Sequence, residues 1–181
     1  MHSKKNQYII AAALVVFAAS MKALTHPFTI DPIIAISLFS GAVISDRKLA
    51  FLMPLAAMFA SDVILEIFKI DVGFYGISQI GNYASLLLIT VIGFGMKNKN
   101  AFSVLAFSLL SSIAFFFLSN TNCFLFDGGL TYSKDLAGWA QCLTAGIPFI
   151  KNGLIIDLAF SSLLFGTYAL VYGKSMNKAQ A

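Results

Sequence analysis

Residues 101–119 read AFSVLAFSLLSSIAFFFLS, a stretch without a single charged side chain. The hydrocarbon core of a bilayer is about 30 Å thick, and a helix of roughly 20 apolar residues is needed to cross it. The stretch is continuously apolar and lacks the period-2 alternation that is typical of a β-barrel strand. It is therefore predicted to be a membrane-crossing helix, and the fold class that it indicates is all-α, a polytopic membrane helical bundle.

The composition of the whole chain agrees with this interpretation. Of its 181 residues, 59% are hydrophobic and 11% are charged, whereas a soluble domain has roughly 25% charged residues because water must wet its surface. The net charge is +4, but the basic residues stand in small groups between apolar runs, as topology determinants do. We therefore expect membrane lipid as a partner and no nucleic acid.

Six apolar runs predict about six transmembrane segments in a single integral membrane domain, residues 1–181. The second run is short, about 21 Å long as a helix. It is rich in small residues, so it is predicted to pack inside the bundle, and Asp31-Pro32 is a favourable helix start. Leu136 to Ile147 is predicted to form a short extra helix in the last outer loop, stopped by Pro148. The six runs are residues 8–24, 32–45, 49–68, 77–96, 101–119 and 150–172.

The first run has a competing interpretation as a cleavable signal peptide. Lys4 and Lys5 precede a short apolar stretch that ends in Ala18-Ala19-Ser20, and this arrangement resembles a leader. The run is nevertheless long enough to cross the membrane, so the favoured prediction keeps it as the first crossing.

The distribution of basic residues predicts the orientation. With a cytoplasmic N-terminus, eight basic residues face the inside and four the outside, which obeys the positive-inside rule and puts the C-terminus in the cytoplasm as well. The inner set is Lys4, Lys5, Arg47, Lys48, Lys97, Lys99, Lys174 and Lys178, and the outer set is Lys22, Lys69, Lys134 and Lys151. Most of the other polar residues then lie on the outer side, which favours a site open to the outside. The alternative is that the outer loops are simply longer and therefore more polar.

Two carboxylates stand within the third run. Asp62 and Glu66 are four residues apart, so they share one helix face. A carboxylate inside a membrane span is costly and normally faces the interior or a wet cavity. Either the two residues polarise the mouth of a binding pocket, or Asp62 forms an ion pair with Lys22 or Lys151 and Glu66 already lies at the membrane interface. An acid–base pair is disfavoured, because catalytic carboxylates must act across a substrate and these two point the same way.

Other polar residues suggest structural roles. Asp157 is the deepest of those in the last run and is expected to pair with a lysine between helices. Cys123 and Cys142 could form a disulfide on an oxidising outer side, or remain two ordinary thiols. The phosphate-binding loop, the His-Glu-x-x-His motif and the Gly-x-Ser-x-Gly motif are all absent. We therefore expect a non-enzymatic protein with no catalytic residue, no metal site and no cofactor.

The order of segments resembles a known family. The quoted stretches are FTIDPIIAI at residues 28–36, LMPLAAM at 52–58, YSKDLAG at 132–138 and AGIPFIKN at 145–152. They resemble an uncharacterised family of small bacterial inner-membrane proteins assigned to transport. That family is similar to the S-components of energy-coupling-factor (ECF) vitamin transporters, and the resemblance covers almost the whole chain.

The resemblance implies a six-helix bundle that captures a small vitamin-like molecule from the outer side of the bacterial inner (cytoplasmic) membrane. It further implies an ECF-type coupling subunit and ATPases as partners. In S-components, Ala-x-x-x-Ala motifs on early helices dock the coupling subunit, and Ala19 and Ala23 have that spacing.

The leading hypothesis is a membrane substrate-capture or transport subunit with a pocket open to the outside. Residues 136–147 would act as a lid, with Trp139 at headgroup depth. The alternative is a non-transport membrane scaffold subunit of a cell-envelope complex, which would not need polar residues concentrated on one side. The expected substrate-binding residues are Asp62, Glu66, Asn120, Trp139 and Asn152.

The charge distribution makes a prediction about topology. Reporter fusions placed after Met96 and after Tyr172 should read cytoplasmic, and a fusion after Gly128 should read external, because the connections rich in basic residues stay inside. Paired alkaline phosphatase and green fluorescent protein fusions measure this directly. An external reading after Tyr172 would contradict the six-crossing arrangement.

Overall fold

The computed structural model describes residues 4–25, 30–126 and 129–177; the side chains of residues 4–8, 11, 19, 23 and 172–177 lie outside the description. The described residues form six helices and no strand, which confirms the predicted all-α membrane bundle. Four of the helices, α3 to α6, are long and apolar enough to cross a membrane. The helices are α1 (Lys4–Thr25), α2 (Ile33–Val43), α3 (Arg47–Ile67), α4 (Ile77–Phe94), α5 (Ala101–Phe126) and α6 (Leu136–Asn177).

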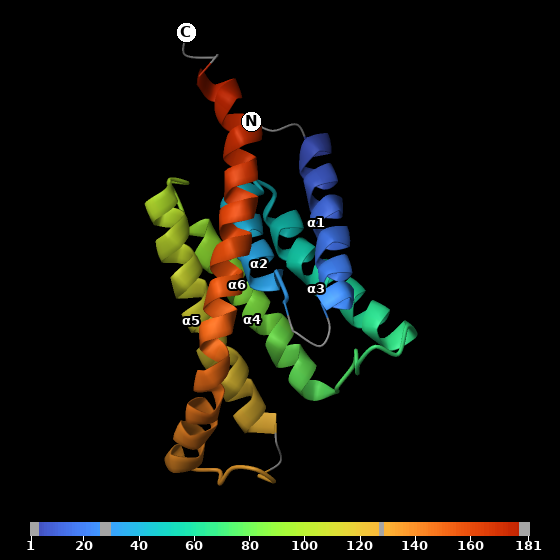
Figure 1. Ribbon diagram of the computed structural model, residues 1–181, viewed down its shortest axis with the longest axis vertical. Coiled ribbons are helices and arrows are strands. Elements are labelled where there is room, and N and C mark those ends of the chain that lie inside the picture. Colours follow the sequence, from blue (N-terminus) through green and yellow to red (C-terminus); the bar gives the residue numbers. More distant parts are fainter. Residues whose placement is uncertain (1–3, 26–29, 127–128, 178–181) are drawn as a thin grey trace.

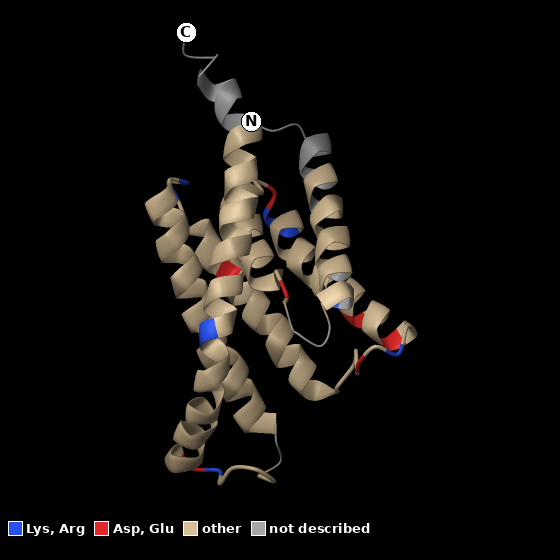
Figure 2. Ribbon diagram, in the orientation of Figure 1, with Lys and Arg blue, Asp and Glu red and all other residues tan. Residues whose placement is uncertain are grey.

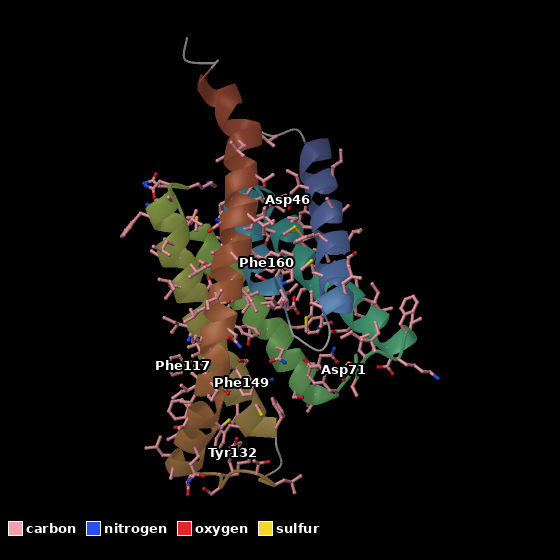
Figure 3. All side chains as sticks on the ribbon, viewed as in Figure 1. Asp46, Asp71, Phe117, Tyr132, Phe149 and Phe160 are labelled. Carbon is pink, nitrogen blue, oxygen red and sulfur yellow. The ribbon has the colours of Figure 1, made fainter. Side chains whose placement is uncertain are left out.

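The helices alternate in direction along the bundle (Figure 1). The start of α1 and the end of α6 lie at one end, which we call the termini end. The α2–α3 and α4–α5 connections lie toward that end, whereas the α3–α4 and α5–α6 connections lie at the opposite end (Figure 1). Figure 3 shows Asp46 toward the termini end, and Asp71 and Tyr132 toward the opposite end.

The short helix α2 is the centre of the bundle. It contacts α3, α4, α5 and α6, and nine of its eleven residues are buried, as the small residues of this run predicted. A helix of eleven residues is only about 16 Å long, so α2 is too short to span the hydrocarbon core by itself. It occupies the half of the bundle nearer the termini end, and α3, α4, α5 and α6 continue past its first turn toward the opposite end (Figure 1).

Two glycines allow α2 to lie directly against α4. A Cβ atom added at Gly41 would come within 2.1 Å of the Thr90 carbonyl oxygen, and one added at Gly93 would come within 2.4 Å of the Leu38 carbonyl oxygen. Such distances are far below van der Waals contact, so the two helix backbones can approach this closely only because both residues lack a side chain. The neighbouring side chains Ile36, Leu38 and Ile89 are completely buried or nearly so.

The prediction of a separate short helix in the last outer loop is wrong. α5 continues to Phe126, and α6 runs without interruption from Leu136 to Asn177, through Pro148. Proline removes one backbone hydrogen bond, but membrane helices tolerate it where neighbouring groups compensate. Here α5 packs on α6 on both sides of Pro148: Gly146 lies against Asn120, and Asp157 bonds to α5 further along the helix. This packing continues the helix through the proline.

The α5–α6 connection is consequently shorter than the sequence suggested. Asp135 caps α6, because its Oδ1 atom accepts hydrogen bonds from the Gly138 amide at 2.7 Å and the Ser133 hydroxyl at 3.0 Å. These two hydrogen bonds lower the pKa of the Asp135 carboxyl below its ordinary value, and the bond from the Gly138 amide has the larger effect. Lys134 folds back toward the carbonyl oxygen and ring of Phe124 on α5. The paired helices are thereby closed at the opposite end.

The glycine contact between α2 and α4 gives a prediction about stability. Gly41→Ala should destabilise the protein by about 1–3 kcal/mol, since the new methyl group must push the backbone of α4 away. Gly166→Ala is the matched control: Gly166 is also helical, but a Cβ there meets no atom within 4 Å. The control should be neutral or slightly stabilising, because alanine favours helix over glycine. Thermal unfolding in detergent compares the two variants, and equal melting temperatures would refute the close contact.

Candidate functional site

Asp62 is the hub of a buried polar network rather than part of a pocket mouth. Its side chain is only 1% exposed. Oδ1 accepts a hydrogen bond from Lys22 Nζ at 2.9 Å, and Oδ2 accepts from Gln79 Nε2 and from the Tyr83 hydroxyl, each at 2.8 Å. The network therefore joins α1, α3 and α4 through one carboxylate.

This geometry decides between the two interpretations that the sequence left open for Asp62. The ion pair with Lys22 exists, whereas Lys151 is exposed on α6. A buried carboxylate of this kind is tolerable because both of its oxygens accept hydrogen bonds and its charge is compensated. The described part of α1 is thus joined to the bundle by Lys22 as well as by the core residues Leu14 and Ala18.

Glu66 has a local role at the α3–α4 turn. It is exposed, and its Oε2 atom accepts a hydrogen bond from the Gly73 amide at 3.0 Å. Gly73 in turn lies so close to the Asp62 carbonyl oxygen that a Cβ atom would come within 2.1 Å of it. Glu66 therefore holds the turn against the end of α3 and faces away from the bundle interior.

The remaining residues of the expected pocket are spread along α5 and α6. Trp139 donates from Nε1 to the Thr121 hydroxyl at 3.0 Å, which fastens the first turns of α6 to α5. Asn120 donates to the Phe116 carbonyl oxygen at 2.8 Å, and Asn152 is exposed on α6. Trp139 consequently belongs to the continuous helix α6 and not to a separate lid helix.

Two adjoining cavities lie where α2 leaves the bundle unfilled. The first, about 220 Å³, is lined by residues from the start of α2 and from α3, α4, α5 and α6. The second, about 240 Å³, lies between α5, α6 and α2. Both have Ile34, Phe115, Gly153 and Asp157 in their walls. Together they fall in the range of about 300–1,000 Å³ that is typical of small-molecule sites.

The polar groups of these cavities differ from those that the sequence indicated. Of the five expected binding residues, Asn120 lines the second cavity, while Asp62, Glu66, Trp139 and Asn152 line neither. The structure therefore does not bring the five residues together into one pocket. The polar side chains that do line the cavities are Asp31, Asn82, Ser112, Ser119, Asn120 and Asp157.

Asp157 is the residue whose surroundings differ most from the prediction. It is buried, with 2% of its surface exposed. Within the described ranges its carboxylate has no lysine partner; its hydrogen-bond donor is the Ser112 hydroxyl, 2.6 Å from Oδ2. The expected interhelical ion pair is therefore not found among the described residues, where the interior lysine, Lys22, is paired with Asp62 and Asp31 instead. The sequence contained one indication of the position of Asp157. The second apolar run is short, so it leaves space opposite the middle of α6.

The sequence also made predictions about two alanines, two cysteines and a metal site. Ala19 and Ala23 are in α1, but their side chains lie outside the described residues. Cys123 and Cys142 are not joined by a disulfide; Cys142 is buried and lies 3.3 Å from the Asn120 carbonyl oxygen. Within the described ranges, no group of three or more His, Cys, Asp or Glu side chains is arranged to hold a metal ion.

Comparison with known proteins places the chain in a family. The chain belongs to the family of unknown function DUF6580. The match covers residues 2–180, which is nearly the whole of this chain, so the bundle and its cavities lie within the family's region. No curated protein and no solved structure matches the chain.

The network around Asp62 gives a prediction about the DUF6580 protein. Lys22→Met should destabilise it by about 3–5 kcal/mol, because removing the cation leaves a buried carboxylate uncompensated. Lys151→Met is the control, since Lys151 is exposed and a change there should cost less than about 1 kcal/mol. Thermal unfolding of both variants in the same detergent measures the difference. Similar melting temperatures would mean that the Lys22–Asp62 pair does not stabilise the bundle.

Proposed function

We propose that this DUF6580 protein is a non-enzymatic membrane subunit that captures a small molecule from the outer side of the membrane, in the manner of an ECF S-component. The observation that carries the proposal is the pair of adjoining cavities beside the start of α2. Their walls are largely apolar, with a few converging polar groups such as Asp31, Asn82 and Asp157. Such a combination is typical of sites that bind small organic molecules.

The distribution of charge supports the direction of capture. Arg47, Lys48, Lys97 and Lys99 stand in or beside the α2–α3 and α4–α5 connections near the termini end, where Figure 2 shows basic segments. By the positive-inside rule, the termini end faces the cytoplasm of a bacterial inner membrane. α2 occupies the cytoplasmic half of the bundle in this orientation. The cavities beside its first turn therefore lie on the side from which an outer substrate would arrive.

The resemblance to S-components supports a partner protein that would receive the captured molecule. α1 packs mainly on α3, at the edge of the bundle, and exposes apolar side chains that include Ile9, Val16 and Leu24. An ECF-type coupling subunit, itself bound to ATPases, would dock on this helix, and Ala19 and Ala23 remain the proposed contact positions. The exposed apolar surface alone is equally suited to lipid.

The proposed site differs in composition from the one expected from the sequence. Asn120 remains a proposed binding residue because it lines a cavity, and Asp157 and Asn82 join it. Asp62 supports the site indirectly by holding α1, α3 and α4 together. Trp139 supports it by fastening α6 to α5 near the opposite end.

Filling the cavities tests the proposal. A Cβ at Gly153 meets no atom within 4 Å, and Gly153 lines both cavities. Gly153→Leu should therefore fold normally while its side chain occupies the space for a ligand. Native mass spectrometry of gently purified protein should find a small molecule on the wild type, and Gly153→Leu should reduce its occupancy by roughly tenfold or more, as for a loss of at least about 1.4 kcal/mol.

Gly166→Leu is the matched control. Gly166 is in the same helix and its Cβ direction is also open, but it lines neither cavity. This variant should retain the molecule. If Gly153→Leu and the wild type carry the same molecule at the same occupancy, the cavities are not the capture site. If neither carries any molecule, a scaffold role in a cell-envelope complex becomes the better explanation.

A further inference from the structure

Within the described ranges, the interior of the bundle holds more carboxyl groups than basic groups. Three carboxylates, Asp31, Asp62 and Asp157, lie within or beside its membrane-spanning helices. Among the described residues, Lys22 is the cation that faces them: its Nζ atom is 2.9 Å from Asp62 and 3.9 Å from Asp31. This lysine is paired with Asp62 and Asp31, and no described cation is paired with Asp157.

The position of Asp157 makes this imbalance relevant to binding. Only 2% of its surface is exposed, and it lies in the shared wall of the two cavities. The Ser112 hydroxyl occupies Oδ2, and within the described ranges Oδ1 receives no hydrogen bond. A carboxyl oxygen that lines a cavity and accepts no hydrogen bond from the protein is available to a ligand group that donates to it.

We propose that the molecule captured in these cavities is a small organic cation, with a protonated amine that pairs with Asp157 and an apolar body. This inference rests on the proposed function and names the substrate class of the same site. The amine donates to Oδ1, in a charge-assisted hydrogen bond that is stronger than a neutral one. The remainder of the molecule lies against apolar walls that include Ile34, Leu86 and Phe115.

Two further features of the cavities favour a cation over an anion or a neutral molecule. Asp31 lines the first cavity with Asp157, so an anionic ligand would meet two like charges. Phe115 lines both cavities, and an aromatic ring attracts a cation that lies over its face. The basic residues that could attract an anion, Lys22 and Lys151, line neither cavity.

The test uses three probes of similar shape and different charge: benzylamine, benzyl alcohol and benzoate. Thermal unfolding of the full-length protein in detergent is followed against the concentration of each probe. Benzylamine should raise the melting temperature, because a ligand that binds the folded state stabilises it, whereas the other two should have little effect. Asp157→Asn should weaken benzylamine binding by roughly ten- to a hundredfold, as for the loss of a charge-assisted hydrogen bond.

The variants separate a binding role from a folding role. Asp157→Asn keeps the size of the side chain and an acceptor for Ser112 while removing an uncompensated charge. Without ligand, this variant should therefore unfold at or above the wild-type temperature. Asp71→Asn removes one acidic charge from the exposed α3–α4 connection and should leave benzylamine binding unchanged. Equal binding of benzylamine to the wild type and to Asp157→Asn, or no binding of benzylamine up to its solubility limit, would overturn the proposal.

The outcomes also distinguish this inference from the proposed function. If benzoate or benzyl alcohol binds the wild type at least as tightly as benzylamine and Gly153→Leu prevents that binding, the cavities capture small molecules but do not select cations. In that case the inference fails and the proposed function stands. If Gly153→Leu binds every probe as the wild type does, the proposed site itself is refuted.

Discussion

At the crossing of α2 and α4, Gly41 and Gly93 bring two helix backbones so close that neither position has room for a methyl group. This contact places α2 at the centre of the bundle, where it touches four other helices. Because α2 has only eleven residues, it does not run the full length of the bundle, and the two cavities lie beside its first residues. The functional interpretation of the cavities therefore depends on where this short helix begins.

The buried charges divide into two kinds. Asp62 is supplied with donors by Lys22, Gln79 and Tyr83, so it acts as a joint between α1, α3 and α4. Asp157 accepts a hydrogen bond from Ser112 and faces the cavities. In a medium of low polarity, a compensated carboxylate stabilises helix positions, whereas an uncompensated one favours a positively charged ligand. The two aspartates thus differ in role because Lys22 pairs with Asp62 and not with Asp157.

The pair α5 and α6 shows where sequence patterns were misleading. Polar residues between Asn120 and Asn152 and the proline at position 148 suggested a long loop with a separate lid helix. In the structure, α5 and α6 continue as packed helices toward the opposite end, where Figure 3 shows Phe117 and Phe149 on their outer surfaces. Phe149 is 74% exposed, so some large apolar side chains of α6 are not buried where α6 packs on α5. Contacts across the pair, such as Trp139 with Thr121, extend both helices beyond the limits that local polarity predicts.

The sequence by itself determined the long apolar helices that suit a membrane, the all-α class and the burial of α2. These properties depend on the apolar length of each segment and on charges near its ends, which are local quantities. Only the tertiary structure decided which lysine compensates Asp62, which residues line the cavities and whether Pro148 interrupts a helix. Lys22 and Asp62 are 40 residues apart, and Ser112 and Asp157 are 45 apart. Pairings at such separations depend on how closely the helices approach one another, and that distance is set by packing at positions such as Gly41 and Gly93, which no local pattern reveals.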